Sequence, residues 1–290
     1  MDNYFVSSCK RVKDWICRQF GQKEKKTVHH KKFADGGEVI VWETGRAGEE
    51  AASYENLFLR KEIAGFRTNI RREQSCSIKS LTRDYLYKQL LSSGEYTFDH
   101  MLVIKDPYGE APLTALALFI LEEPACVRVT TKGNLKETDF VTELPKKKEH
   151  RVPILGMYAE KANDIVIEIL DDEGNCVKSH TFTIRTKRLP KSLRNVITVK
   201  KWTDKPAYSN IMINGGVKIH TCVFDIEGEI RYYLSRKPRG YGIFPLSDGH
   251  FFYMEKYISV PSYSNPQTVE SYDMDYFGRV FRTYLTEKGV

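Results

Sequence analysis

Residues 164–186 read DIVIEILDDEGNCVKSHTFTIRT, and this stretch decides the fold class. Two short runs rich in strand-forming residues, Asp164 to Leu170 and Val177 to Thr186, flank the turn sequence DDEGN. A turn sequence that contains Gly-Asn between two such runs indicates a reversal of the chain. The stretch therefore predicts an antiparallel β-hairpin.

Similar short runs precede this hairpin from about Thr97 onward, separated by turn sequences such as Asp-Pro-Tyr-Gly and Lys-Gly-Asn. About seven short strands within about 90 residues are typical of an immunoglobulin-like β-sandwich. The absence of a Cys-Trp-Cys pattern argues against a domain of the antibody family. The other predicted strands are His100–Lys105, Thr114–Ile120, Ala125–Thr131 and Val152–Tyr158.

The first 96 residues have a different, partly helical pattern. Helical spacing is visible in residues 12–20, with Val12, Trp15, Ile16 and Phe20 on one face, and in residues 77–91, with Ile78, Leu81, Tyr85 and Leu90. A strand is predicted at Glu38–Trp42. We expect the apolar stripes to dock on the following domain, and a membrane-surface anchor is the alternative.

Two segments near the C-terminus repeat one another. FDIEGEIRYYL at residues 224–234 and MDYFGRVFRTY at residues 274–284 place Asp and Gly at the same internal distance, with a period of 50 residues. In D-x-x-G the Asp can bind turn amides and the Gly can adopt a positive φ, so the motif predicts a tight turn between strands. The period suits a four-stranded propeller blade, and a small separate β domain is the alternative.

The fold class predicted from these patterns is mainly β. It comprises an immunoglobulin-like β-sandwich, an incomplete β-propeller of one to two blades, and a mixed helical N-terminal segment. The expected boundaries are 1–96 for the mixed α/β extension, 97–190 for the sandwich and 191–290 for the first blades of a truncated propeller.

Charge and cysteine content restrict the class of function. The 45 Lys and Arg are scattered among 38 Asp and Glu, which favours a solvated surface over a nucleic-acid-binding groove. No cysteine pair has metal-ligand spacing, so structural thiols are expected and no metal site. Because the first residues contain no apolar run of signal-peptide length and no stretch is long enough to cross a bilayer, a cytoplasmic protein without membrane partners is expected.

Several segments together resemble one enzyme family. The segment DPYGEAPLTALALF at residues 106–119 and the segment HRVPILGMY at residues 150–158 occur in the order found in bacterial arylsulfate sulfotransferases. The D-x-x-G segments at 224–233 and 274–280 are similar to the first propeller strands of the same enzymes. The resemblance covers about residues 100–290 and leaves the first hundred without a counterpart.

The resemblance implies an enzyme that transfers a sulfuryl group from a phenolic sulfate ester to a phenol through a sulfohistidine, without a cofactor. It also implies that His and Arg side chains converge in the central funnel of a propeller. This sequence offers no position onto which those catalytic residues can be carried over, so we expect no catalytic, cofactor-binding or metal site in it. We therefore expect a truncated product that is inactive alone. Its expected partners are the phenolic sulfate esters and phenols of the complete enzyme. A second copy of the chain, in a homodimer, or a complementing polypeptide is the expected protein partner.

The histidines of this chain lie outside the family's active-site motif. His250 follows a hairpin Asp-Gly and is expected at the surface, and His150 is expected as an exposed residue at the start of a strand. The alternative function is a non-catalytic β-sandwich module that binds a protein or a glycan through the aromatic tail. Such aromatics are more often core than contact surface, and they are Tyr232, Tyr233, Phe251, Phe252, Tyr253, Tyr257 and Tyr263.

Overall fold

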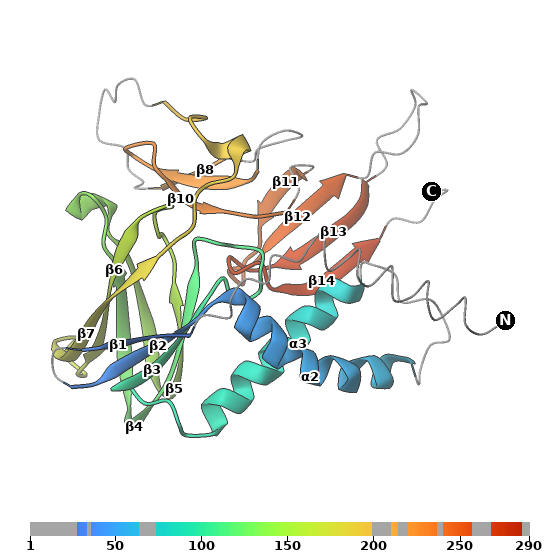
Figure 1. The fold of residues 1–290 in the computed structure, drawn as a ribbon. Helices are drawn as coiled ribbons and strands as arrows, with labels where there is room; N and C mark the ends of the chain where they lie inside the picture. Colours follow the sequence, from blue (N-terminus) through green and yellow to red (C-terminus); the bar gives the residue numbers. More distant parts are fainter. Residues whose placement is uncertain are drawn as a thin grey trace, which may run out of the picture.

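The fold is mainly β, as the sequence predicts. The computed structural model describes residues 28–33, 36–63, 74–198, 210–213, 220–236, 240–256 and 268–285, and Figure 1 shows how their strands and helices are arranged. The helix predicted at residues 12–20 lies outside these ranges. Of the helices described, none is long and apolar enough to cross a lipid bilayer.

A seven-stranded sheet forms the main body of the molecule. Its order is β1-β2-β3-β4-β6-β7, and β5 pairs with the other edge of β4. On one edge, the start of β4 (residues 115–118) pairs with β3, whereas its end (residues 126–131) pairs with β6. The register of β4 and β5 shifts between Ile120 and Ala125. The two ends of this long hairpin therefore belong to different halves of the sheet. The strands are β1 (Val28–Lys32), β2 (Glu38–Trp42), β3 (His100–Lys105), β4 (Ala115–Thr131), β5 (Phe140–Ile154), β6 (Ala162–Leu170) and β7 (Cys176–Arg185).

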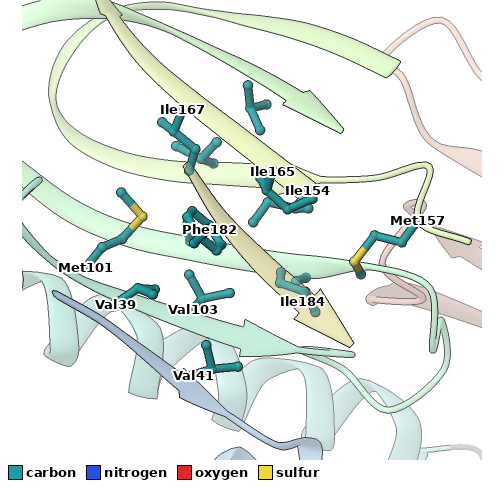
Figure 2. Close-up of a cluster of buried hydrophobic side chains, with 14 of the residues drawn as sticks. Val39, Val41, Met101, Val103, Ile154, Met157, Ile165, Ile167, Phe182 and Ile184 are labelled. Atoms are coloured by element: carbon teal, nitrogen blue, oxygen red, sulfur yellow. The ribbon is translucent and has the colours of Figure 1, made fainter. Parts of the chain in front are cut away.

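The two sheet halves pack face to face around the main core. Figure 2 shows Val39, Val41 and Val103 from β2 and β3 on one side, with Ile167, Phe182 and Ile184 from β6 and β7 opposite them. All of these side chains are buried, which makes this body a β-sandwich.

The hairpin at residues 164–186 is confirmed. Strands β6 and β7 pair antiparallel with Asp164 opposite Thr183. Between them, Asp171 Oδ1 accepts hydrogen bonds from the amides of Glu173 and Asn175 at 3.1 and 2.7 Å. Gly174 has φ +84°, so the turn uses the glycine as the sequence requires.

Two helices cover the outer face of the β2–β3–β4 half. They are α2 (Thr44–Ile63) and α3 (Gln74–Ser92), and they connect β2 to β3, which pair in parallel. Such a parallel connection needs a crossover of this kind. The predicted helix at residues 77–91 is confirmed, but its face was partly wrong: Leu81 is 45% exposed, whereas Leu86, Tyr87 and Leu91 are buried under the sheet.

Strand β2 belongs to the first predicted segment and hydrogen-bonds to β3 of the second. The two segments therefore share one sheet and one core. The boundary at residue 96 stays a prediction, and the first segment contributes strands and helices directly to the sandwich.

The C-terminal strands form two further antiparallel sheets. A three-stranded sheet has the order β10-β9-β8, with β8 (Asn210–Ile213), β9 (Cys222–Asp225) and β10 (Ile230–Tyr233). A four-stranded sheet joins β11 (Gly240–Pro245), β12 (Phe251–Lys256), β13 (Thr268–Met274) and β14 (Val280–Leu285) in sequence order. This simple meander is the topology of a propeller blade. In Figure 1 the meander lies beside the upper end of α3.

The largest difference from the sequence prediction concerns β5. It begins at Phe140 rather than at Val152, and its polar first half pairs with β4 as far as Thr131. Charged residues such as those at 146–149 are poor indicators of a strand. Because β5 begins earlier, the expectation of an exposed edge position for His150 was wrong: the residue lies within β5, is 2% exposed and stacks on Phe119.

Candidate functional site

Both D-x-x-G repeats form the same turn. Asp225 Oδ1 accepts hydrogen bonds from the amides of Glu227 and Glu229 at 3.0 and 3.1 Å, and Asp275 Oδ1 accepts those of Phe277 and Arg279 at 2.9 and 3.1 Å. The glycines have φ +86° and +76°. The turn at Asp171 in the sandwich has the same pattern, so the motif specifies a hairpin turn, and its surroundings decide its role.

The second carboxylate oxygen of Asp225 binds Arg231, and this pair is the centre of what we call the first joint, formed by Gly156, Tyr158, Asp225 and Arg231. Arg231 Nη1 lies 3.0 Å from Asp225 Oδ2. Arg231 Nε donates to the carbonyl of Gly156 at 2.7 Å, and its guanidinium lies 3.9 Å from the centre of the Tyr158 ring. The joint therefore ties the loop after β5 to the sheet of β9 and β10.

The first joint is inaccessible to water. Asp225 is 0% and Arg231 is 1% exposed. Arg231 Nη1 also donates to the carbonyl of Thr138 and to the Tyr158 hydroxyl at 2.9 and 3.0 Å. Burial raises the pKa of the Tyr158 hydroxyl, so the phenol stays protonated and donates to Asp225 Oδ2 at 3.2 Å. A buried charge with this many partners is held in one geometry.

A second joint fixes the meander to the sandwich and to α3; it comprises Asp84, Tyr108, Glu110, Gly278 and Arg279. Asp84 Oδ1 accepts a hydrogen bond from the Tyr108 hydroxyl at 2.6 Å. Asp84 Oδ2 forms an ion pair with Arg279 at 2.7 Å. A Cβ atom on Gly278 would lie 2.3 Å from the Cβ of Glu110, so these two segments of the chain are in contact there. The joint is extended by Ser80 Oγ, which accepts the amide of Val280 at 2.9 Å.

The segments that carry the family resemblance meet at these joints. PILGMY (residues 153–158) supplies Gly156 and Tyr158, whereas the first D-x-x-G segment supplies Asp225 and Arg231. DPYGEAP (residues 106–112) supplies Tyr108 and Glu110, which face the second D-x-x-G segment. These motifs therefore hold the sandwich and the following sheets together.

Asp106, at the turn that supplies the second joint, is a buried carboxyl group. Burial raises its pKa from the ordinary value of 3.8 to about 6. Its backbone is in the left-handed region, with φ +47°, and its Oδ1 accepts the Ala111 amide at 2.9 Å. Burial likewise raises the pKa of Asp275 to about 6.

Asp106→Asn is expected to stabilise the protein at neutral pH. A carboxyl group with a raised folded-state pKa contributes stability that is complete below its ordinary pKa and is lost as pH rises through about 6. Asn keeps the acceptor and tolerates positive φ but cannot ionise. Urea unfolding should show the variant gaining over the parent protein between pH 4 and pH 7.5. Glu122→Gln, which removes an exposed charge, should show no such pH-dependent gain, and a parallel gain in both variants would disprove the assignment.

The described histidines have structural partners. His180 is stacked between Phe33 and Phe98 at centroid distances of 4.0 and 4.6 Å and contacts Asp99 at 2.8 Å. His250 contacts Asp273 at 3.0 Å and stacks on Phe281, so it lies at a hairpin as predicted but is only partly exposed. In the ranges that the structure describes, no three His, Cys, Asp or Glu side chains are grouped to hold a metal ion.

Sequence reasoning missed both joints. Asp225 was recognised as a turn former but not as the partner of Arg231, because the sandwich groups that surround this buried pair lie 67 to 93 positions away from it in the sequence. One indication was present: Arg231 interrupts the apolar run of a short strand, EIRYYL, at residues 229–234. A charged residue in such a run is either exposed at an edge or buried with a partner.

The comparisons with known proteins point to the same part of the chain. Residues 102–187 match the family model described as the arylsulfotransferase Ig-like domain. These are β3 to β7 of the sandwich together with the loop that supplies Gly156 and Tyr158. No curated protein matches the chain at a significant level.

Proposed function

We propose that the chain is the N-terminal portion of an arylsulfate sulfotransferase, because residues 102–187 match the model of the arylsulfotransferase Ig-like domain. The observation that carries the proposal is the location of the joints. The matched domain contacts the two C-terminal sheets through Gly156, Tyr108 and Glu110, which belong to the segments that resemble that family. A domain built in this way positions the sheets that follow it.

The proposed reaction of the complete enzyme is a two-step displacement at sulfur. A histidine nitrogen attacks the sulfur of a phenolic sulfate ester, the bond from sulfur to the phenolic oxygen breaks, and a phenolate leaves. The oxygen of an acceptor phenol then attacks the same sulfur, the sulfur–nitrogen bond breaks, and the phenolic proton passes to the departed phenolate or to water, which restores the histidine. Cationic side chains stabilise the charge on the sulfuryl oxygens in both steps.

We propose that this chain provides the scaffold and that the reacting groups come from a part of the enzyme that it does not contain. Two of the described histidines support this division, because His150 and His180 are buried and stacked on phenylalanine rings. Arg231 supports it too, since its guanidinium is already engaged by Asp225 and two carbonyl groups. A cation held in this way is not available to a sulfuryl group.

The experiment is a sulfuryl-transfer assay with the purified 290-residue chain. The chain is incubated with a chromogenic aryl sulfate and an acceptor phenol, and release of the phenolate is followed by absorbance. Release at the background rate is expected, together with an unchanged intact mass after quenching, because no histidine carries the sulfuryl group. Sustained turnover, or a mass increase of one sulfuryl group, would overturn the division of roles.

A non-catalytic module that binds a protein partner is the second candidate. The aromatic tail is not its contact surface, since Tyr232, Tyr233, Phe251 and Tyr253 are buried and Phe252 is partly buried; Tyr257 and Tyr263 lie outside the described residues. The observation that favours this candidate is a basic groove on the sandwich, between β1 and β7.

A further inference from the structure

Strands β1 and β7 are the two ends of the strand order β1-β2-β3-β4-β6-β7, and they approach one another. Figure 1 shows them side by side at one end of the sandwich. Lys31 Nζ of β1 donates a hydrogen bond to the carbonyl of Thr183 in β7 at 2.9 Å. A groove of about 930 Å³ lies between the two strands. Among the strands that the structure describes, none pairs with the outer edge of either.

The edge of β7 presents backbone hydrogen-bonding groups to this groove. On the inner side, the Thr186 amide donates to the carbonyl of Lys161 at 3.2 Å, and the carbonyl of Ile184 accepts from Asn163 at 3.3 Å. Because successive residues of a strand direct their backbone groups to opposite sides, Thr183 and Arg185 direct theirs toward β1. The bond from Lys31 to the Thr183 carbonyl agrees with this direction. Such an edge can accept another strand.

The groove has an apolar floor and basic rims. Val41 and Ile184 form part of its lining, and both are buried at the edge of the main core; Figure 2 shows them on facing strands. Arg185, by contrast, is exposed on β7. An extended segment bound here would therefore place alternate side chains on the floor and at the rims.

The charges around the groove are mostly positive. Among the described residues, its lining includes four Lys and Arg side chains and one carboxylate, that of Glu43. Glu43 is bound to Lys105 at 2.7 Å and lies 3.9 Å from His29, and His30 lies 3.4 Å from Glu38 on the adjacent strand. Asp164 of β6 accepts from the Thr183 hydroxyl at 2.9 Å. The basic lining residues are Lys31, Lys105, Arg185 and Lys187.

We propose that this groove binds an extended acidic segment of a partner protein, which adds to the edge of β7 as a strand. Its alternate apolar side chains lie on Val41 and Ile184, and its carboxylates face Lys31, Arg185 and Lys187. This mode of recognition takes affinity from backbone hydrogen bonds and specificity from alternate side chains. Residues 1–27 of the same chain do not fit, because they contain seven Lys and Arg and three Asp and Glu. The inference is independent of whether the complete protein transfers sulfuryl groups.

The test uses the whole chain and a fluorescent peptide of alternating Glu and Val. Fluorescence anisotropy is expected to show saturable binding, and hydrogen exchange is expected to slow at the Thr183 and Arg185 amides. A peptide of alternating Lys and Val is the charge control. A Glu-Val peptide of the same length in which every second Val is replaced by Pro is the backbone control, because it keeps every charge and Pro cannot donate to a strand.

Two variants separate the contribution of charge from the contribution of backbone hydrogen bonds. Arg185→Glu combined with Lys187→Glu should weaken the Glu-Val peptide about tenfold, whereas Lys148→Glu, an exposed charge on β5, should leave it unchanged. Thr183→Pro removes an amide donor at the β7 edge without changing a charge and should also weaken binding. Circular dichroism establishes that each variant is folded.

Some results would overturn the proposal. Equal binding of the Lys-Val peptide would mean that binding does not depend on the charge of the peptide. Equal binding of the peptide containing Pro would mean that binding does not occur by strand addition. Binding that is lost equally in Lys148→Glu would show a general attraction of anions to a basic protein. Absence of binding by the parent chain would also exclude the acidic segment as the occupant.

Discussion

Arg231→Met is expected to lower the free energy of unfolding by about 3–5 kcal/mol. The substitution keeps an unbranched apolar stem but leaves the Asp225 carboxylate, which is 0% exposed, without its counter-charge. It also frees the carbonyl groups of Gly156 and Thr138, which Arg231 now binds. The buried Asp225 charge would keep only neutral donors, and the two carbonyl groups would lose their bonds from Arg231; both losses are expensive in an interior of low polarity.

Urea unfolding, followed by tryptophan fluorescence and circular dichroism, measures this change. Arg128→Met is the matched control, because Arg128 pairs with Glu168 at 3.0 Å on the sandwich surface and is 27% exposed. We expect the control to cost less than about 1 kcal/mol. Asp225→Asn combined with Arg231→Met should recover part of the loss, since no lone charge remains buried. Equal costs for Arg231→Met and Arg128→Met would contradict the first joint.

Gly278→Ala is expected to separate the meander from the sandwich at the second joint. Gly278 has φ +76°, and a Cβ atom there would lie 2.3 Å from the Cβ and 3.4 Å from the Cα of Glu110. The positive φ costs a non-glycine residue about 1–2 kcal/mol, and overpacking adds about 1–3 kcal/mol. Gly278→Ala should therefore lower the free energy of unfolding by about 2–5 kcal/mol in total.

Gly174→Ala is a close control, because Gly174 occupies the same D-x-x-G turn with φ +84° and has no atom within 4 Å of an added Cβ. It should lower the free energy of unfolding only by the cost of the positive φ, about 1–2 kcal/mol. Hydrogen exchange in the Gly278→Ala protein should become faster in β14, including at its first residue, Val280, whose amide donates to Ser80 Oγ. Equal destabilisation by the two substitutions, without faster exchange in β14, would disprove the contact with Glu110.

The sequence predicted the parts of the fold that depend on local patterns. The hairpin at 164–186, the strands at 38–42 and 100–105 and the turns at Asp225 and Asp275 follow from short runs of strand-forming residues and from Asp-Gly geometry. Strand β5 was missed in its first half because residues 140–149 are mostly polar, and pairing with β4 rather than local propensity makes them a strand. Leu81 was assigned to the wrong face of α3 because the helix buries Tyr87 and Leu86 instead.

The joints and the groove could not be predicted in the same way. Asp225 and Arg231 are close in sequence, but the groups that make their pair favourable, Gly156, Tyr158 and Thr138, lie on the sandwich. The groove depends on the approach of β1 to β7, strands more than 140 residues apart. Single-sequence patterns contain little information on such contacts, whereas family resemblance indicated the segments that form the joints.

The central claim is that this chain supplies the N-terminal part of an arylsulfate sulfotransferase. It is tested most directly by a chimera in which residues 97–285 replace the matching portion of an active enzyme of that family, assayed with para-nitrophenyl sulfate and phenol. Sulfuryl transfer by the chimera, lost when Arg231 is replaced by Met, is the expected result. A chimera that folds with both joints protected from hydrogen exchange, yet transfers no sulfuryl group, would contradict the claim.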